Sequence, residues 1–391
     1  MKKVFIIFFI ITITAASFSG CGKSQQKDIE KRAIILSAGY DLSKEGKFIV
    51  TMQAIKPQTR TERGGAAATQ TPSDVIIHSS TGRTVNEAFD EVSGVLGKQP
   101  YFSHEKFIII GESLARKGIE LVLDSCLRGR ETRPNVPIYV CKENAYDYIK
   151  TRGLDEAIPS EEIINIMELQ AQKGFTFLTS PVEMYNSISQ NSYNITGVVS
   201  FERKKAGDVP SDIFNISGSA IFKKDKLLGF LDKQETKALA LIKNKVKTGD
   251  FTLQVPESPN EIITLEIADA KCKTIPVIND NNISMLLIIK VKSNIAETNF
   301  KANLKKNPDV IHKIEQLENE EIKKQIQALI YKLQKEYKMD VLGFGEALNK
   351  NYPKVWKDNK EKWNDVFSEI KVDIQVESHI ELTGSITKPA Y

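Results

Sequence analysis

The sequence predicts an α+β fold of more than one domain, with mixed β-sheets packed against helices and one long helix in the C-terminal domain. Runs with apolar residues at every second position, such as 48–54, are typical of half-buried strands. Other segments have apolar residues three and four apart, which is typical of amphipathic helices. The chain of 391 residues is also long enough to bury two or three hydrophobic cores.

The first 20 residues have the pattern of an export signal. Lys2 and Lys3 precede a nearly unbroken apolar stretch over 4–16, which has the length of a signal's hydrophobic region and is too short to span a bilayer comfortably. We therefore expect residues 1–20 to be a signal peptide that is removed from the mature protein.

Cys21 stands directly after two small residues, Ser19 and Gly20, and this order is typical of bacterial lipoprotein signals. Phe18 departs from the leucine that usually stands three positions before such a cysteine. We expect cleavage before Cys21 and acyl chains, such as palmitate, on this residue; ordinary secretion with a free thiol is the alternative. Each buried methylene contributes about 0.8 kcal/mol, so two or more long chains would hold the protein firmly to a membrane.

The charge balance and the remaining cysteines limit the possible partners and redox chemistry. The formal net charge is +4, and +2 without Lys2 and Lys3, which is too balanced to indicate a nucleic-acid partner. Cys126, Cys141 and Cys272 are too few for a disulfide framework, so we expect buried free thiols, with one bridge as the alternative. No later hydrophobic run reaches membrane-spanning length, so we expect a soluble body held beside a membrane.

Residues 21–202 are predicted to form an N-terminal α/β domain. Strands are expected at 33–36 and 47–54. The following segment, 57–72, lacks apolar periodicity and is expected to be a mobile loop. Beyond it strands and helices alternate, which is typical of a sheet layered with helices.

Four helix starts are marked by side chains that can accept hydrogen bonds from free backbone N–H groups. They are Thr84 with Glu87, Ser160, Ser180 before Pro181, and Asp232 with Glu235. We therefore expect four capped helices.

The polar segment 203–214 contains Gly207 and Pro210 and is predicted to be a linker between domains. Residues 215–391 would then form a C-terminal α+β domain. Its long helix is expected over 307–338, where apolar residues recur at helical spacing without a sustained heptad. This pattern favours a packed domain helix over a coiled coil.

No pattern in the sequence identifies a catalytic, cofactor or metal site. The histidines lack the spacing of zinc ligands; they are His78, His104, His312 and His379. The sequence has no Gly-x-Ser-x-Gly turn, and no glycine-rich segment has the spacing of a phosphate or dinucleotide loop. We therefore predict no catalytic residue, no metal site and no cofactor.

Residues 223–247 hold eight lysines against Asp225, Asp232 and Glu235. We favour a solvated surface as the interpretation of this cluster. The alternative is attraction to anionic lipid head groups beside the expected anchor.

Gly343, Phe344 and Gly345 form a short segment in which two glycines bracket an aromatic residue. One hypothesis is a contact point for a partner. The interpretation that we favour is a helix stop, with glycine at a positive φ and Phe344 in the core. Trp356 and Trp363 are seven residues apart, so on a continuous helix they would share one face as core anchors.

Four regions stand in a characteristic order behind the lipoprotein-like start. They are AIILSAGYD (33–41) with GKFIVTMQ (46–53), FSHEKFIIIGESLARKGI (102–119), SGSAIFKKDKLLGFLDKQETKAL (217–239) and DVLGFGEALNKNYPKVW (340–356). In this order they resemble the Ger(x)C family of spore germination lipoproteins, the C subunits of nutrient germinant receptors. The resemblance covers essentially the whole mature chain.

This resemblance implies a non-catalytic protein that is lipid-anchored on the outer face of the inner membrane of a bacterial spore. It would assemble with two integral-membrane subunits, one of them transporter-like, and act in assembly or signal transmission when nutrients trigger ion release. Two alternatives come from other classes. A lipid-anchored solute-binding protein of a transporter would have two similar lobes around a cleft, and a tethered cell-wall hydrolase would need paired carboxylates or a metal.

Overall fold

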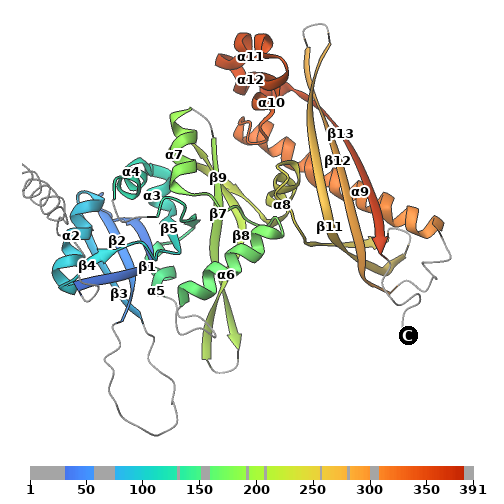
Figure 1. Cartoon of the computed structure of the whole chain (residues 1–391). Coiled ribbons are helices and arrows are strands. Elements are labelled where there is room, and N and C mark those ends of the chain that lie inside the picture. Colours follow the sequence, from blue (N-terminus) through green and yellow to red (C-terminus); the bar gives the residue numbers. More distant parts are fainter. Residues whose placement is uncertain are drawn as a thin grey trace, which may run out of the picture.

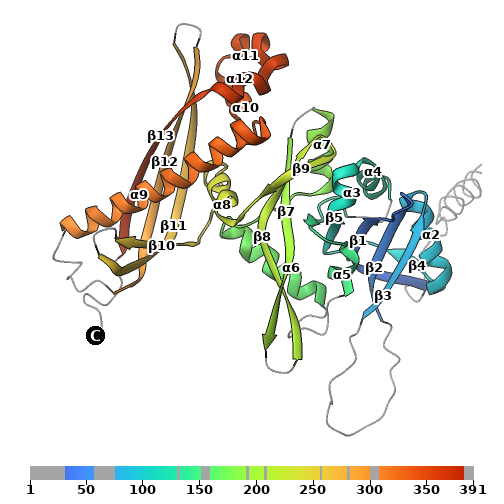
Figure 2. The same cartoon turned by 180° about the vertical axis from the view of Figure 1, so that it is seen from behind.

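The computed structural model contains two β-sheets with a buried helix, α8 (Lys233–Ile242), packed against strands of both (Figures 1 and 2). It describes residues 31–56, 75–129, 133–150, 159–190, 193–206, 209–255, 258–279, 282–299 and 308–382. The predicted signal peptide 1–20, the predicted lipidation site Cys21 and the predicted loop 57–72 lie outside these described residues.

The first sheet has nine strands in the order β3-β2-β1-β5-β6-β7-β8-β9, with β4 paired to β1. These strands are β1 (Arg32–Leu42), β2 (Phe48–Ile55), β3 (Val75–Gly82), β4 (Gln99–Tyr101), β5 (Phe107–Gly111), β6 (Ile138–Cys141), β7 (Tyr193–Ala206), β8 (Val209–Lys223) and β9 (Lys226–Leu231). The central strands β1, β5, β6 and β7 are parallel, and both flanks are antiparallel. The sheet is therefore mixed, as predicted.

Helices cover both faces of this sheet (Figure 1). They are α2 (Val85–Leu96), α3 (Glu112–Lys117), α4 (Glu120–Arg128), α5 (Ala145–Lys150), α6 (Pro159–Gln172) and α7 (Pro181–Ser189). On β5, Ile108 and Ile110 join an apolar cluster with α2 and α4, while Phe107 and Ile109 join another with α5 and α6. Successive side chains of a strand point to opposite faces, so β5 is buried from both sides.

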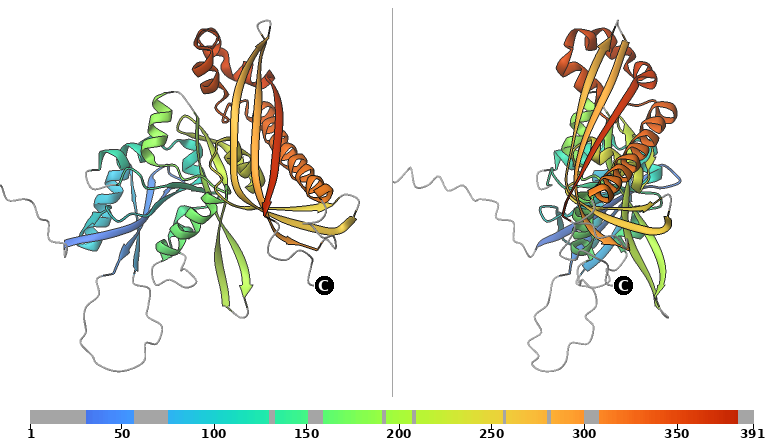
Figure 3. Two further views of the ribbon diagram at one scale, coloured as in Figure 1. Left: turned by 45° about the vertical axis from the view of Figure 1, so that its right-hand side comes forward. Right: turned by 90° about the vertical axis from the view of Figure 1, so that its right-hand side faces the viewer.

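In the segment predicted as a linker, 203–214, the described residues 203–206 and 209–214 are instead the far part of strands β7 and β8. Their register runs from Arg203 opposite Asp212 to Ala206 opposite Val209. The hairpin extends beyond the rest of the sheet in both views of Figure 3. A hairpin end that reaches away from the core is as polar as a linker, so composition did not separate the two. Strands β8 and β9 therefore complete the first sheet, and the division into domains 21–202 and 215–391 stays a prediction.

The second sheet has four strands in the order β10-β11-β12-β13. They are β10 (Asp250–Val255), β11 (Ser258–Asn279), β12 (Asn282–Thr298) and β13 (Lys371–Leu382). Strands β11 and β12 form a long antiparallel hairpin, and β13 joins β12 in parallel from the C-terminal end of the chain.

The predicted long helix is confirmed as α9 (Pro308–Tyr331), which continues as a π-helical segment, Lys332–Tyr337. It crosses one face of the second sheet, behind the strands in Figure 1 and in front of them in Figure 2. Its buried side includes Ile314, Ile322 and Ile326, which lie in one core with α8 and the second sheet.

Three short helices connect the long helix to β13. They are α10 (Phe344–Asn351), α11 (Pro353–Asn359) and α12 (Trp363–Glu369), with a 3-10 turn at Lys360–Lys362 between the last two. Trp356 and Trp363 would share one face on a continuous helix, but this turn separates them. Their rings still meet, with centroids 5.1 Å apart.

Three of the four predicted helix caps are confirmed. Ser160 is instead the second residue of α6 (Pro159–Gln172), so it does not cap that helix. Ser180 and Asp232 form complete capping boxes with the third residue of their helices. Thr84 accepts a hydrogen bond from the N–H of Glu87, but the Glu87 carboxylate accepts from the N–H of Arg83, one residue before the expected donor. Local sequence therefore determines where these helices begin.

The three cysteines of the body are buried free thiols; they are Cys126, Cys141 and Cys272. Burial raises the pKa of Cys126 to about 12 and that of Cys272 to about 11, so neither is a ready nucleophile at neutral pH. Within the described part of the chain, no helix is long and apolar enough to cross a membrane.

Candidate functional site

The segment 340–345 carries the chain from the long helix into α10. The π-helical segment ends at Lys338, with a φ of +47°, and Gly343 precedes α10 with a φ of +88°. The predicted positive φ of Gly343 is confirmed, and glycine adopts it without steric cost. The helix stop lies earlier than predicted, because Lys338 ends the long helix and Gly343 begins the next one.

The carboxylate of Asp340 holds this turn together. Its Oδ1 accepts hydrogen bonds from the backbone N–H groups of Gly343 at 2.9 Å and Phe344 at 3.0 Å. Its Oδ2 accepts from the N–H of Gly345 at 2.7 Å and from Nε1 of Trp363 at 2.9 Å. The first N–H groups of a helix lack partners inside it and attract negative charge. One buried carboxylate thus satisfies the start of α10 and fastens it to α12.

Phe344 is fully buried, and its ring centroid lies 5.9 Å from that of Phe367. This is the core position that the sequence favoured. The partner contact predicted for Gly343, Phe344 and Gly345 stays a prediction, and in this structure only the two glycines line a surface pocket.

Gly345 has a separate reason to be glycine. A Cβ atom there would lie 2.8 Å from the ring of Trp356 and 2.9 Å from Nε1 of Trp363. Real Cβ atoms do not approach other atoms so closely. The close packing of the two tryptophans on α10 therefore needs a residue without a side chain at this position.

A pocket of about 580 Å³ opens beside this turn. On one side lie α10, α11 and α12, and on the other lie the end of α7 and the start of β7. Its lining residues are Gln190, Tyr193, Asp340, Gly343, Gly345, Glu346, Asn349, Trp356, Lys360, Glu361, Trp363 and Asn364. Concave sites between different parts of a fold are common places for ligands.

A buried pair of polar groups stands next to the pocket. Nζ of Lys243, at the end of α8, donates a hydrogen bond of 2.8 Å to the hydroxyl of Tyr193. Burial lowers the pKa of Lys243, and the nearby carboxylates of Glu346 and Asp340 oppose that shift. Gly343 lies against the same group, since its Cβ position is 3.5 Å from the Tyr193 oxygen and 3.9 Å from Nζ of Lys243.

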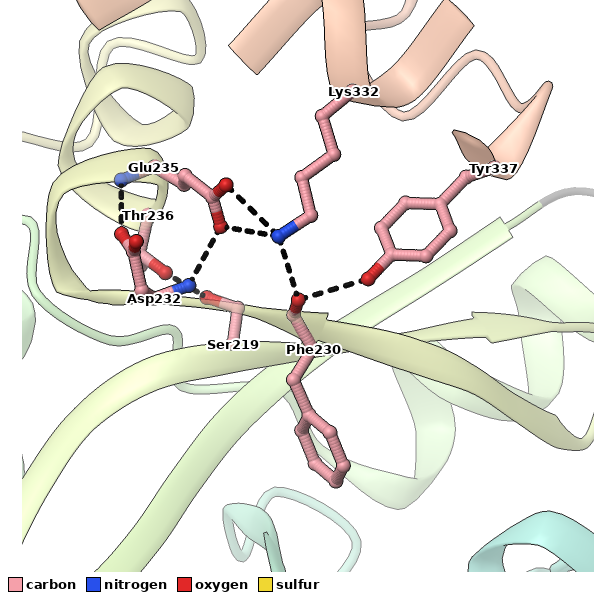
Figure 4. Close-up of polar contacts among 7 residues, drawn as sticks. All are labelled: Ser219, Phe230, Asp232, Glu235, Thr236, Lys332 and Tyr337. Carbon is pink, nitrogen blue, oxygen red and sulfur yellow. Dashed lines mark hydrogen bonds and ion pairs between the residues drawn. The ribbon is translucent and has the colours of Figure 1, made fainter. Parts of the chain in front are cut away.

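A second polar cluster joins the long helix to the first sheet (Figure 4). Nζ of Lys332 lies 2.8 Å from both carboxylate oxygens of Glu235 and 3.4 Å from the carbonyl oxygen of Phe230. The hydroxyl of Tyr337 donates to the same carbonyl at 2.9 Å. Gly229 leaves room for this, because a Cβ there would lie 2.5 Å from the Tyr337 oxygen. We call these residues the junction.

The lysine cluster at 223–247 is partly a solvated surface, as favoured, but two of its members are not. Lys243 is half-buried beside the pocket, and Lys237 is buried. Nζ of Lys237 donates to the carbonyl of Asp250 at 2.7 Å and lies 3.5 Å from the ring centroid of Phe251. Burial lowers the pKa of Lys237 to about 8. Lys237 is on α8 and Lys243 caps its C-terminal end. The number of lysines in the segment could not show that this helix packs between two sheets.

Glu105 is a buried carboxyl group that no pattern in the sequence indicated. It is 4% exposed, and its Oε1 accepts no hydrogen bond from the residues that the structure describes. Burial raises the pKa of Glu105 to about 8. The charge of Glu105 in turn contributes to the raised pKa values of Tyr40 and Cys126. Glu105 stands just before the apolar strand β5, and this pattern does not indicate whether its carboxyl group is buried or exposed.

The fold brings together two histidines that are far apart in the sequence. Nδ1 of His312 lies 3.1 Å from one carboxylate oxygen of Glu315, and Nδ1 of His379 lies 3.3 Å from the other. Both histidines are exposed. Among the described residues, no group of three or more His, Cys, Asp or Glu side chains could hold a metal ion.

Comparison with known proteins gives matches along the chain. Residues 25–199 match the model of the spore germination protein N-terminal domain, and residues 217–384 match that of the spore germination B3/GerAC-like C-terminal domain. The chain is 24% identical to spore germination protein KC of Bacillus subtilis (strain 168), over 100% of this chain and 98% of that protein. It is 25% identical to spore germination protein B3 of the same organism, over 99% of both chains.

Two further comparisons agree with these. Spore germination protein A3 of Bacillus subtilis (strain 168) is 22% identical over 96% of each chain. The crystal structure of the GerBC protein matches 88% of this chain and 96% of its own, with a TM-score of 0.58 and 20% identity, and so shares the fold. The mixed α+β architecture and the resemblance stated from the sequence are both confirmed, and the chain belongs to the GerAC-like family of spore germination proteins.

Proposed function

We propose that this protein is the lipid-anchored, non-catalytic subunit of a nutrient germinant receptor. It would lie on the outer face of the spore inner membrane and assemble there with two integral-membrane subunits. The observation that carries this proposal is the match to spore germination proteins along the whole chain, through both the N-terminal and the C-terminal family models.

Anchoring is supported by Cys21, which follows a hydrophobic run and two small residues. Nine residues lie between Cys21 and Lys31, where the described fold begins, and an extended chain over these ten residue steps spans at most about 35 Å. A body on so short a tether stays in a thin layer beside the bilayer. Its effective concentration toward membrane-embedded partners is then far above its average concentration in the compartment.

A non-catalytic role is supported by what the polar groups beside the pocket do. Asp340 accepts four hydrogen bonds from its own chain, and Lys243 donates to Tyr193. These groups hold backbone and helices in place, and a carboxylate so fully paired is poorly suited to take up a proton from a substrate.

The solute-binding alternative is not favoured by the architecture. A protein of that class was expected to have two similar lobes around a cleft. Here the first sheet has nine strands with helices on both faces, and the second has four strands crossed by one long helix.

The junction supports a role in transmitting movement. Glu235 at the start of α8 pairs with Lys332, the first residue of the π-helical segment that continues α9, so a displacement of the long helix acts directly on the first sheet and on α8. A receptor subunit with such a contact can pass a shift in one half to the other as a rigid-body change.

The test is a deletion in the spore-forming host, with complementation by the wild-type gene or by Cys21→Ala. We expect the deletion to block nutrient-triggered germination while vegetative growth stays normal, and we expect only the wild-type gene to restore germination. Normal nutrient response in the deletion strain, after other receptors of this family are removed, would contradict the proposed function. Full rescue by Cys21→Ala would contradict the anchor alone.

A further inference from the structure

The pocket beside α10 offers few groups for an anion. The backbone N–H groups of Gly343, Phe344 and Gly345 would form an anion site if they were free, but Asp340 uses all three. Asp340 also accepts a hydrogen bond from the indole N–H of Trp363. The backbone donors of this wall are therefore already bonded to a carboxylate of the protein itself, and the uncharged donors left in the lining are the side-chain amides of Gln190, Asn349 and Asn364.

The side chains that remain favour positive charge in the pocket. Glu346 on α10 and Glu361 in the 3-10 turn are exposed carboxylates in its lining. Lys360 is the lining lysine, and its Nζ lies 3.6 Å from Glu361. Lys243 stands behind Tyr193 and donates to it, and burial lowers the pKa of this lysine. The lining therefore presents more carboxylates than ammonium groups to a ligand.

Aromatic rings supply the second part of the site. Trp356 is half-buried in the lining, and its ring meets that of Trp363 edge to face, at an interplanar angle of 70°. Tyr193 lines the pocket from the side of β7. A cation that loses water between aromatic rings and carboxylates gains about 1 kcal/mol or more from each favourable ring. The described residues contain no cluster that could hold a metal ion, so the chemistry points to an organic cation.

We propose that this pocket binds an organic cation, an alkylammonium or guanidinium group that is carried by a small solute or by a lysine or arginine side chain of a partner protein. This inference goes beyond the proposed function, and it does not depend on the lipid anchor. It assigns a ligand chemistry to the segment 340–363, in which the glycines, Asp340 and both tryptophans build one wall.

Tryptophan fluorescence gives a direct test, because Trp356 and Trp363 are the two tryptophans of the chain. Purified protein is titrated with n-butylammonium and n-butylguanidinium, with sodium butyrate and sodium chloride as controls at matched ionic strength. We expect a saturable change in emission with the two cations and none with the controls. No change with either cation, or an equal change with sodium butyrate, would overturn the proposal.

Variants locate the binding. In a protein with Glu346→Gln and Glu361→Gln together, we expect affinity for butylammonium to fall by about tenfold, because both carboxylates are gone. Glu320→Gln, at an exposed position on α9, is the matched control and should bind like the wild type. Circular dichroism and melting temperature confirm that the variants are folded. Unchanged affinity in the folded double variant would contradict the site.

Two further probes separate the sources of the cation. Nα-acetyl-lysine amide carries its only charge on the side chain, as in a partner protein, and leucine amide carries its only charge on the α-amino group. Binding of the first alone assigns the pocket to a partner's side chain, and binding of the second alone assigns it to a small solute. Either result supports the proposal, and failure of both refutes it.

Discussion

Two buried carboxyl groups in this protein differ in how many hydrogen bonds their surroundings donate to them. Asp340 is 6% exposed and Glu105 is 4% exposed, so burial alone does not distinguish them. Asp340 accepts four hydrogen bonds, whereas Oε1 of Glu105 accepts none among the described residues, and the pKa of Glu105 is raised to about 8. Both residues lie in segments that resemble the family, Glu105 in 102–119 and Asp340 in 340–356. The comparison shows that one segment uses its charge to fasten helices, while the other holds a carboxyl group that is most stable when neutral.

The largest expected effect comes from removing the satisfied carboxylate. Asp340→Ala leaves three backbone N–H groups and one indole N–H without their acceptor, so we expect the free energy of unfolding to fall by about 4 kcal/mol. Urea unfolding followed by tryptophan fluorescence measures it. Glu320→Gln, at an exposed position on α9, is the control and should change stability little. A loss below 1 kcal/mol for Asp340→Ala would mean that this carboxylate does not hold the turn.

The second effect tests the unsatisfied carboxyl group through pH. Burial raises the pKa of Glu105 from about 4.5 to about 8, so the folded state binds more protons than the unfolded state between these values. Its contribution is fully present below the unfolded pKa and is lost as pH rises through the folded pKa. We expect the wild type to lose roughly 3 kcal/mol between pH 5 and pH 8 relative to Glu105→Gln.

The measurement is urea unfolding at several pH values for the wild type, for Glu105→Gln and for Glu120→Gln. Glu120 is an exposed residue of α4, and its variant should follow the wild-type pH dependence. Parallel curves for the wild type and Glu105→Gln would show that Glu105 is ionised and paired in the fold, and the contrast with Asp340 would disappear.

The third effect separates close packing from the hydrogen bonds of Asp340. Gly345→Ala places a Cβ against both tryptophan rings, so we expect a loss of about 2 kcal/mol and a shift of the tryptophan emission. Gly94→Ala in α2 is the matched control, because no atom lies within 4 Å of the added Cβ and alanine favours the helix by about 0.5–1 kcal/mol. Equal effects at the two glycines would contradict the packing argument.

The smallest effect concerns the junction, where polar groups pair across the two halves. Tyr337→Phe removes the hydrogen bond to the carbonyl of Phe230 and keeps the ring, so we expect a loss of about 1 kcal/mol in thermal unfolding. Tyr331→Phe, at an exposed position on the same helix, should be neutral. If the two variants melt alike, Tyr337 does not fasten the long helix to β9.

Local signals in the sequence were sufficient for three of the four predicted helix starts and for the long helix, whereas Ser160 lies inside its helix. Ser180 and Asp232 cap their helices through atoms only three residues away, so their effect does not depend on distant parts of the chain. The long helix follows in the same way from apolar residues at helical spacing. Gly343 also has the positive φ that its place in the sequence suggested.

The features that the sequence missed depend on contacts between distant segments. In the polar segment 203–214, residues 203–206 pair with residues 209–212 as parts of strands β7 and β8, and only this register distinguishes the segment from a linker. Lys237 looked like one lysine of a solvated cluster, yet Phe251 and the carbonyl of Asp250 enclose it. The pocket likewise needs Tyr193 from β7 beside helices more than 140 residues later in the chain.

The most direct test of the receptor assignment is recovery of the wild-type protein from spore membranes in mild detergent. Mass spectrometry then identifies the proteins that come with it and the mass of its N-terminal peptide. We predict an acylated Cys21 at the N-terminus and two integral-membrane subunits recovered together with the chain. An unmodified Cys21 in a freely soluble protein, with no multi-span partner, would contradict the account.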